Sequence, residues 1–138
     1  MTLNSKFHAD LKKFSKKVEV KTENLVKSTA RATYKVITHM APVKTGSYVK
    51  SNRIGIGSID PQVITIPEEL ALGENEAKSQ AYIEQLPKIE LFRLENKFIS
   101  ISNNIHYALK VEYGWPKHGK RGYAPYRMAY EVVKAGII

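Results

Sequence analysis

The sequence predicts an α+β domain in which a long N-terminal helix packs on a small antiparallel sheet and a short helix closes the chain. Three observations support this fold class. They are an apolar stripe at helical spacing over the first 40 residues, alternating apolar and polar residues near position 100, and an apolar segment that begins with a proline near the C-terminus. A helix and a sheet each bury one apolar face, and packing them together satisfies both.

The apolar stripe begins at Phe7 and reaches Met40 in steps of three or four residues, which keeps it on one side of an α-helix. A single helix over residues 3–40 would be roughly 57 Å long, more than a domain of this size covers, so part of it needs another partner. The stripe is weakest at Thr22, where a hinge is the alternative to an unbroken helix. We expect the stripe, Phe14 included, to lie in the core. Its members are Phe7, Leu11, Phe14, Val18, Thr22, Leu25, Thr29, Thr33, Val36 and Met40.

The first helix should end at Ala41, because the following Pro42 lacks a backbone donor and favours an extended residue before it. Gly46 then allows a turn with positive φ. Residues 47–53 fit either a helical turn or the entry to a strand. Residues 54–67 fit an irregular loop or an edge strand, since two prolines bar a central position in a sheet.

Further elements are predicted between residues 74 and 102. An acidic helix should cover 74–86 and end at Pro87. Two strands, 89–94 and 98–102, should form a β-hairpin. The helix residues that we expect to be buried are Ala77, Ala81, Ile83 and Leu86.

The last third of the chain predicts two helices around a basic loop. Residues 107–112 fit a short helix closed by Gly114, and a glycine-bounded basic loop follows at 115–122. Pro125 suits the first position of a final helix that continues to Ala135. Its predicted buried residues are Met128, Val132 and Ala135.

The composition indicates one domain, residues 1–138, with 43% hydrophobic residues for a single core. The chain has no cysteine, and its four histidines are far apart, so we expect no metal site and no cofactor. No segment approaches the roughly 18 consecutive apolar residues that span a bilayer. We therefore expect a soluble protein that is made in the cytoplasm and does not enter a membrane.

The net charge of +9 belongs to the two ends of the chain. Residues 1–53 hold 12 basic and 3 acidic side chains, residues 54–105 hold 4 and 8, and residues 106–138 hold 6 and 2. A basic surface fits nucleic acid, an acidic protein partner, or a face that is only solvated. Because no base-reading motif is present, we expect any binding to DNA to be weak and independent of sequence.

No catalytic motif is recognisable, and we expect that the protein is not an enzyme. The loop at 117–121 combines basic charge with the flanking Trp115 and Tyr123, which could bind phosphate and stack on bases. The favoured interpretation is that these two aromatic residues attach a solvated loop to the body. The candidate interface residues are Lys12, Lys13, Lys16, Lys17, Trp115, Lys117, Lys120 and Arg121.

Three segments resemble a known family. Residues 41–51, Ala-Pro-Val-Lys-Thr-Gly-Ser-Tyr-Val-Lys-Ser, are similar to the "P-V-x-T-G-x-L-x-x-S" segment of the lambda-type minor tail protein Z family, the tail-completion and neck proteins of tailed phages. Residues 103–114 resemble its "N-x-x-x-Y-A-x-x-V-E-F/Y-G", and residues 124–129 resemble its closing proline, aromatic residue and arginine. Their order agrees with the family. Residues 55–88 are longer than its pattern and form an insertion-like segment, and residues 115–118 replace a glycine-threonine loop.

The resemblance implies a structural protein of the virion, assembled in the host cytoplasm. Such a protein forms a homo-oligomeric ring, with six copies expected by analogy, at the head-proximal end of the tail. The implied neighbours are the tail tube or its terminator and the head connector, with non-specific contact to genomic DNA in the channel. No catalytic residues come with the resemblance. The alternative is a small basic nucleic-acid-binding module that uses the first helix.

Overall fold

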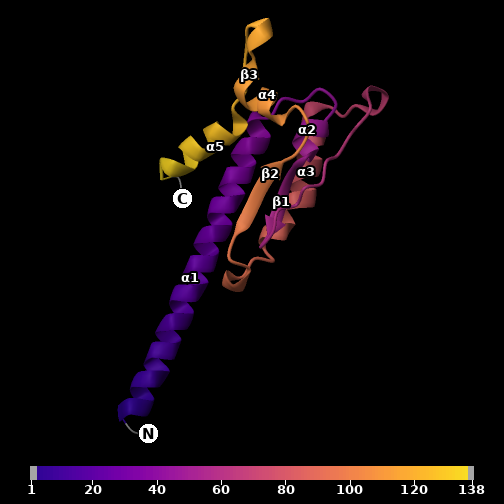
Figure 1. Ribbon diagram of the computed structural model, residues 1–138. Coiled ribbons are helices and arrows are strands. Elements are labelled where there is room, and N and C mark those ends of the chain that lie inside the picture. Colours follow the sequence, from indigo (N-terminus) through magenta and orange to yellow (C-terminus); the bar gives the residue numbers. More distant parts are fainter. Residues whose placement is uncertain (1–2, 137–138) are drawn as a thin grey trace.

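The computed structural model describes residues 3–136, and α1 (Leu3–Met40) dominates it. This helix runs through Thr22 without a break, so the structure has no hinge there. In Figure 1 the C-terminal half of α1 lies among the other elements, while the N-terminal half projects away from them. The predicted fold class is confirmed, because the long helix, a small antiparallel sheet and a short C-terminal helix are all present.

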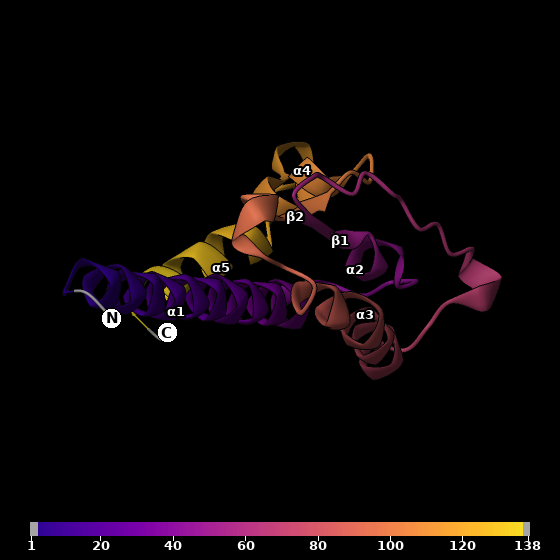
Figure 2. The same ribbon diagram turned by 90° about the horizontal axis from the view of Figure 1, so that it is seen from below.

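The segment that sequence patterns left undecided contains both alternatives. Gly46 has a φ of 100° and begins α2 (Ser47–Lys50), a single helical turn, and β1 (Asn52–Ile56) follows it directly. A loop then runs to η1 (Glu68–Leu70) and leads into α3 (Glu74–Ile89). Figure 2 shows this loop and η1 extending away from α1 on the side of α3.

The sheet pairs β1 with β2 (Ile99–Asn103) in antiparallel register, with Ile54 opposite Ile101. The predicted hairpin between 89–94 and 98–102 is wrong. Ile89 ends α3, and residues 94–96 form the 3₁₀ turn η2 (Leu94–Asn96). Ile89 at the end of α3 and Phe92, three residues after it, are 0% and 1% exposed, so both are buried without belonging to a strand.

Helix α3 buries one residue per turn, at Ala77, Ala81, Gln85 and Ile89. Ile83, which we expected inside, is 74% exposed because it lies two residues from this row. The Gln85 side chain accepts a hydrogen bond from the Ile54 N–H at 3.0 Å, which covers part of the outer edge of β1. Pro87 lies in the last turn and does not end the helix, because its missing N–H removes only one bond there.

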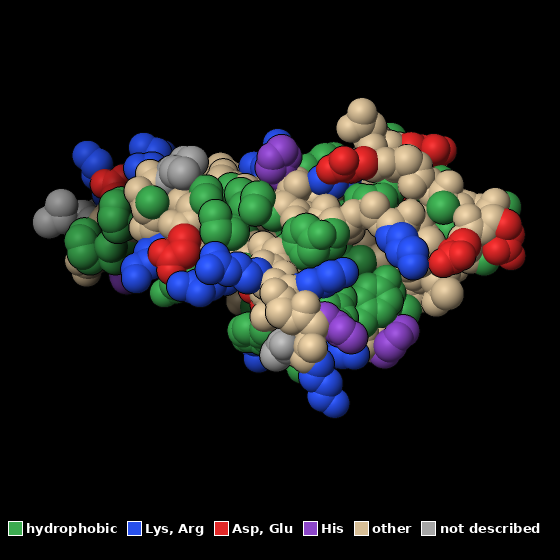
Figure 3. All heavy atoms as spheres, turned by 90° about the horizontal axis from the view of Figure 1, so that it is seen from above, with side chains coloured by type: hydrophobic (Ala, Val, Ile, Leu, Met, Phe, Trp, Pro, Cys, Tyr) green, Lys and Arg blue, Asp and Glu red, His purple; other side chains and the backbone are tan. Residues whose placement is uncertain are grey.

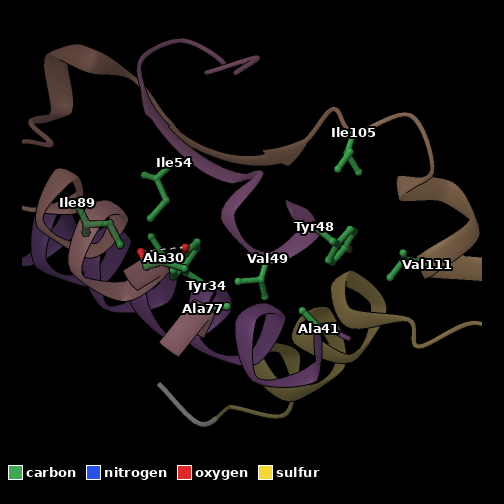
Figure 4. Close-up of a cluster of buried hydrophobic side chains, with 11 residues drawn as sticks. Ala30, Tyr34, Ala41, Tyr48, Val49, Ile54, Ala77, Ile89, Ile105 and Val111 are labelled. Atoms are coloured by element: carbon green, nitrogen blue, oxygen red, sulfur yellow. Dashed lines mark hydrogen bonds between the residues drawn. The ribbon is translucent and has the colours of Figure 1, made fainter. Parts of the chain in front are cut away.

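The core forms where the C-terminal half of α1 meets α3, β1 and β2. Tyr34 is 0% exposed, and its hydroxyl donates to the Ala81 carbonyl at 3.2 Å, as Figure 4 shows. Arg31 also pairs with Glu90, with 2.6 Å between Nη1 and Oε1. The buried apolar residues of this contact are Ala30, Tyr34 and Ile37 of α1 and Ala41 directly after it.

The prediction that Phe14 lies in the core is wrong, since its side chain is 66% exposed. All described side chains from residue 4 to residue 18 are exposed as well. The sequence contains two apolar faces at helical spacing, and the shorter one, from Ala30 to Ala41, is the face that packs on α3 and the sheet. We call residues 4–22 the arm.

Helix α5 (Pro125–Lys134) packs along the C-terminal half of α1, with Ala129 fully buried at the contact. Pro125 occupies the first turn as predicted. Among the expected buried residues, Val132 is half-buried, but Met128 is 40% exposed and Ala135 is exposed. The buried row of α5 runs through Pro125 and Ala129, one residue away from the predicted Met128. Before α5, α4 (Ala108–Tyr113) ends at Gly114 as predicted.

The loop after β1 is fixed by side chains of β1 and of Ser51, which lies between α2 and β1. Ser51 Oγ accepts from the Ile64 N–H at 2.9 Å, and Arg53 pairs with Asp60 at 3.1 Å. Partial burial raises the pKa of Asp60, but hydrogen bonds from the Gln62 N–H, Arg53 and Lys88 outweigh it and hold this pKa below its usual value. The anionic carboxylate therefore stabilises the folded loop above the ordinary aspartate pKa, and that stabilisation is lost as the pH falls through the lowered pKa.

The burial pattern makes a matched prediction for two isoleucines. Ile54→Ala should lower the free energy of unfolding by about 2–5 kcal/mol, because Ile54 is 1% exposed and truncation leaves a cavity. Ile83→Ala, at a site that is 74% exposed, should change it by less than about 0.5 kcal/mol. Urea denaturation followed by circular dichroism measures both. Equal losses would mean that α3 packs through another face.

Candidate functional site

The candidate interface residues lie at two opposite ends of the molecule. Lys12, Lys13, Lys16 and Lys17 are exposed on the arm. The other four candidates belong to a hairpin that β3 (Gly114–Trp115) and β4 (Lys120–Arg121) form around η3 (Pro116–His118). Figure 1 shows the hairpin beyond the C-terminal end of α1, far from the arm. The structure therefore contains two separate basic surfaces.

A set of hydrogen bonds around Asn52, which is 0% exposed, joins distant parts of the chain. The Asn52 side-chain oxygen accepts from Asn103 Nδ2 at 3.0 Å and from the Tyr126 hydroxyl at 2.8 Å. Asn103 Nδ2 also donates to the Tyr48 carbonyl at 2.8 Å. These bonds connect α2, β1, β2 and α5 around one amide, which we call the Asn52 hub.

A second contact fixes the start of α5. The first turn of this helix carries no acidic residue, and Ala124 before it has a φ of 48° with no side-chain cap. The Glu112 carboxylate of α4 instead accepts from the N–H groups of Tyr126 and Arg127, at 2.9 and 3.2 Å. An anion at a helix N-terminus satisfies unpaired donors and the helix dipole. Glu112 therefore couples α4, and the hairpin after it, to α5.

The base of the hairpin requires a glycine at position 114. Gly114 has a φ of 97°, and a Cβ there would collide with the Lys120 carbonyl of the returning strand. The Tyr123 N–H then donates to the Val111 carbonyl at 2.8 Å, which attaches the end of the hairpin to α4. The hairpin is thus held at its base, while its tip is exposed.

A groove of about 710 Å³ lies between residues 42–48 and the hairpin. The Tyr48 and Tyr107 rings stack at its wall with centroids 6.4 Å apart. Trp115 also lines the groove and packs against the core, which agrees with the interpretation that it attaches the loop to the body; Tyr123 is 51% exposed. The basic residues of the lining are Lys44, His118, Lys120 and Arg121.

The candidates Trp115, Lys120 and Arg121 line this groove, but sequence reasoning did not name its other basic and aromatic residues Lys44, Tyr48 and Tyr107. Lys44, Tyr48 and Tyr107 lie within the segments that resemble the phage family, so the signal existed there. No local pattern shows that these segments meet. Lys117 is on the exposed 3₁₀ turn and is not part of the lining.

The groove offers positive charge and ring faces to a ligand or partner. Burial raises the pKa of the Tyr48 and Tyr126 hydroxyls, and the Tyr126 hydroxyl donates a hydrogen bond to Asn52. Across residues 3–136, no three His, Asp or Glu side chains gather in a way that could hold a metal ion. Within that same range, no helix is long and apolar enough to cross a membrane.

The arm is strongly amphipathic as well as basic. The apolar stripe along it is bare, with Phe7 60% exposed, Phe14 66% and Leu25, just beyond the arm, 58%. Lysines occupy much of the remaining circumference. In Figure 3, basic side chains gather over the arm at the left and the hairpin at the bottom, whereas acidic ones gather at the right, towards η1 and the start of α3.

Comparison of the chain with protein-family models, curated proteins and solved structures found no match in any of the three.

The Asn52 hub predicts the effect of removing one hydroxyl. Tyr126→Phe should lower the free energy of unfolding by about 1–2 kcal/mol, because it deletes a donor to the buried Asn52 oxygen and keeps the ring. Tyr130→Phe is the control, since this residue is on the same helix and 61% exposed. Thermal unfolding of both variants measures the difference. An equal melting temperature for the two variants would show that the hydrogen bond from Tyr126 to Asn52 does not stabilise the fold.

Proposed function

We propose that this chain is a structural protein of a tailed-phage virion, forming a ring at the head-proximal end of the tail, where it completes the tail or joins it to the head connector. One observation supports this proposal most. The three segments that resemble the lambda-type minor tail protein Z family, residues 41–51, 103–114 and 124–129, are far apart in the sequence but come together beside the Asn52 hub.

The residues that carry the resemblance have structural contacts. Asn103 bonds the hub, Glu112 caps α5, and Gly114 allows the hairpin to return. Tyr126 donates to Asn52, and Gly46 begins α2 with positive φ. A pattern of this kind specifies a local fold and an exposed hairpin. This favours a family whose members act by assembling, as the resemblance implies.

The exposed surfaces also suit a subunit with several neighbours. A ring of identical head-to-tail contacts needs two different surfaces on each copy, and the chain offers the basic groove at one end and an acidic face on η1 and α3. Residues 68–90 hold six acidic and two basic side chains. Groove and acidic face are complementary in charge. Six copies is the number expected by analogy with tail tubes.

The gene-deletion phenotype in the phage is the test of this function. Phage lacking the gene should accumulate DNA-filled heads and tails that are unjoined or have defective junctions, visible by electron microscopy of the lysate. Complementation with Lys120→Glu plus Arg121→Glu should fail, because both change the groove, whereas Lys134→Glu at the exposed end of α5 should restore infectivity. Normal, infectious particles without the protein would contradict the proposal.

The second candidate is a nucleic-acid-binding module, which the exposed lysines of the arm favour. Binding through these lysines should be weak, indifferent to sequence and steeply salt-dependent, with a slope of about 0.9 per phosphate contacted. Replacing Lys12, Lys13, Lys16 and Lys17 by Gln should flatten the slope more than replacing Lys117, Lys120 and Arg121. Titration of two unrelated duplexes at low and moderate salt measures this. A preference for one duplex that persists at moderate salt would place this candidate above the virion protein.

A further inference from the structure

The spacing of the stripe on α1 is symmetric about its centre. Antiparallel pairing of two copies of α1 would place Phe7 opposite Met40, and Leu11 opposite Val36. It would likewise place Phe14 opposite Thr33, Val18 opposite Thr29 and Thr22 opposite Leu25. The position numbers of every pair add to 47. A two-fold axis near residues 23 and 24 would therefore bring every member of one stripe against a member of the other.

The three threonines of the stripe are compatible with an apolar contact. The hydroxyl of Thr22 donates to the Val18 carbonyl at 2.8 Å, that of Thr29 to Leu25 at 2.8 Å, and that of Thr33 to Thr29 at 2.7 Å. Each hydroxyl is thus satisfied by its own helix. Covering these side chains with a second helix leaves no donor without a partner.

The stripe leads from the arm into an apolar groove of about 750 Å³. Its floor contains Val36 and Met40, and Val36 lies 11 residues, or three helical turns, after the exposed Leu25. Side chains of α3 and α5 form the walls, namely Tyr82, Leu86, Met128 and Val132. A helix that follows the stripe of one copy in the antiparallel direction enters this groove with its own Phe7 and Leu11.

We propose that two copies of this chain pair through antiparallel α1 helices, with the arm of each copy in the groove beside the α5 helix of the other. Because α1 is unbroken, an arm that lies along the groove of a second copy brings that copy's arm along its own groove. The contact is consequently isologous and closes at two. The pairing does not depend on the proposed virion function. A ring built from head-to-tail contacts lacks this two-fold contact, so the pair is the form of the free protein.

Charge and size agree with a second copy as the occupant. Asp10 of the arm lies opposite position 37 of the other copy, between Lys35 and His39, which line the groove. The paired face is about 50 Å long and about 10 Å wide. With the groove walls added, its area approaches the roughly 800 Å² per partner of a stable interface. Phe7 and Phe14 alone remove on the order of 200 Å² from water on each copy.

Sedimentation velocity over a concentration series tests the pairing. The wild-type chain should sediment as a monomer at low concentration and with twice its 15.6 kDa mass at high concentration. Phe14→Asp should raise the dissociation constant at least about 100-fold. Ile83→Asp, which places the same charge at an exposed isoleucine outside the stripe, should pair like the wild type. Circular dichroism should show that both variants stay folded.

Engineered cysteines test the direction, since the native chain has none. A mixture of Val18→Cys and Thr29→Cys proteins should form mainly the mixed disulfide on oxidation. Homodimers linked through Val18→Cys alone would indicate parallel helices and would overturn the proposal. So would a wild-type chain that remains monomeric at about 100 µM, or pairing that Phe14→Asp leaves unchanged.

Charge reversal provides a rescue experiment. Asp10→Lys should weaken the pair by placing a lysine near Lys35 and His39 of the other copy. Adding Lys35→Asp to the same chain should restore much of the lost affinity, because opposite charges face each other again. Failure of this rescue, with the mixed disulfide still formed, would overturn the charge alignment at the groove.

Discussion

The fold depends on the division of α1 into a C-terminal half that is packed in the core and an N-terminal half that is exposed. Its C-terminal half supplies Ala30, Tyr34 and Ile37 to a core in which Tyr34 is completely buried and bonded to α3. Its N-terminal half continues the same helix past the last element that could cover it. Short isolated helices are marginal in water, so the arm depends on the packed half to nucleate and hold it. The apolar residues of the arm are exposed because the helix is longer than the domain that could cover it.

The Asn52 hub and the Glu112 cap fix the elements that lie at the C-terminal end of α1. They join α2, β2, α4 and α5 by directional bonds, which set where the hairpin leaves the body. The basic groove lies beside the hub, since Tyr48, whose carbonyl accepts from Asn103, also lines the groove. The chain thus carries a groove at one end and an apolar, lysine-rich helix at the other. Such a division suits a protein that acts through contacts with other chains.

Local patterns predicted the elements that local interactions determine. The extent of α1, the positive φ of Gly46, the closure of α4 by Gly114 and the start of α5 at Pro125 all follow from residues close in sequence. The pairing of β1 with β2 could not be predicted from local patterns. It depends on the burial of Ile54 and on the side chain of Gln85, which lie far apart along the chain. The stripe was assigned to the core because periodicity identifies an apolar face without identifying its partner. The sequence indicated the hairpin residues of the groove but not the groove itself, since Tyr48 and Tyr107 meet through tertiary packing.

Hydrogen exchange along α1, followed residue by residue over a range of protein concentrations, tests the central claim that only half of this helix belongs to the domain. Amides from about residue 27 to residue 40 should be strongly protected at every concentration, because their opening requires the core to open. Amides of the arm should exchange quickly in dilute solution and become protected as the concentration rises and copies pair. An arm protected as strongly as the core at the lowest concentration, or a C-terminal half that exchanges as quickly as the arm, would contradict the account.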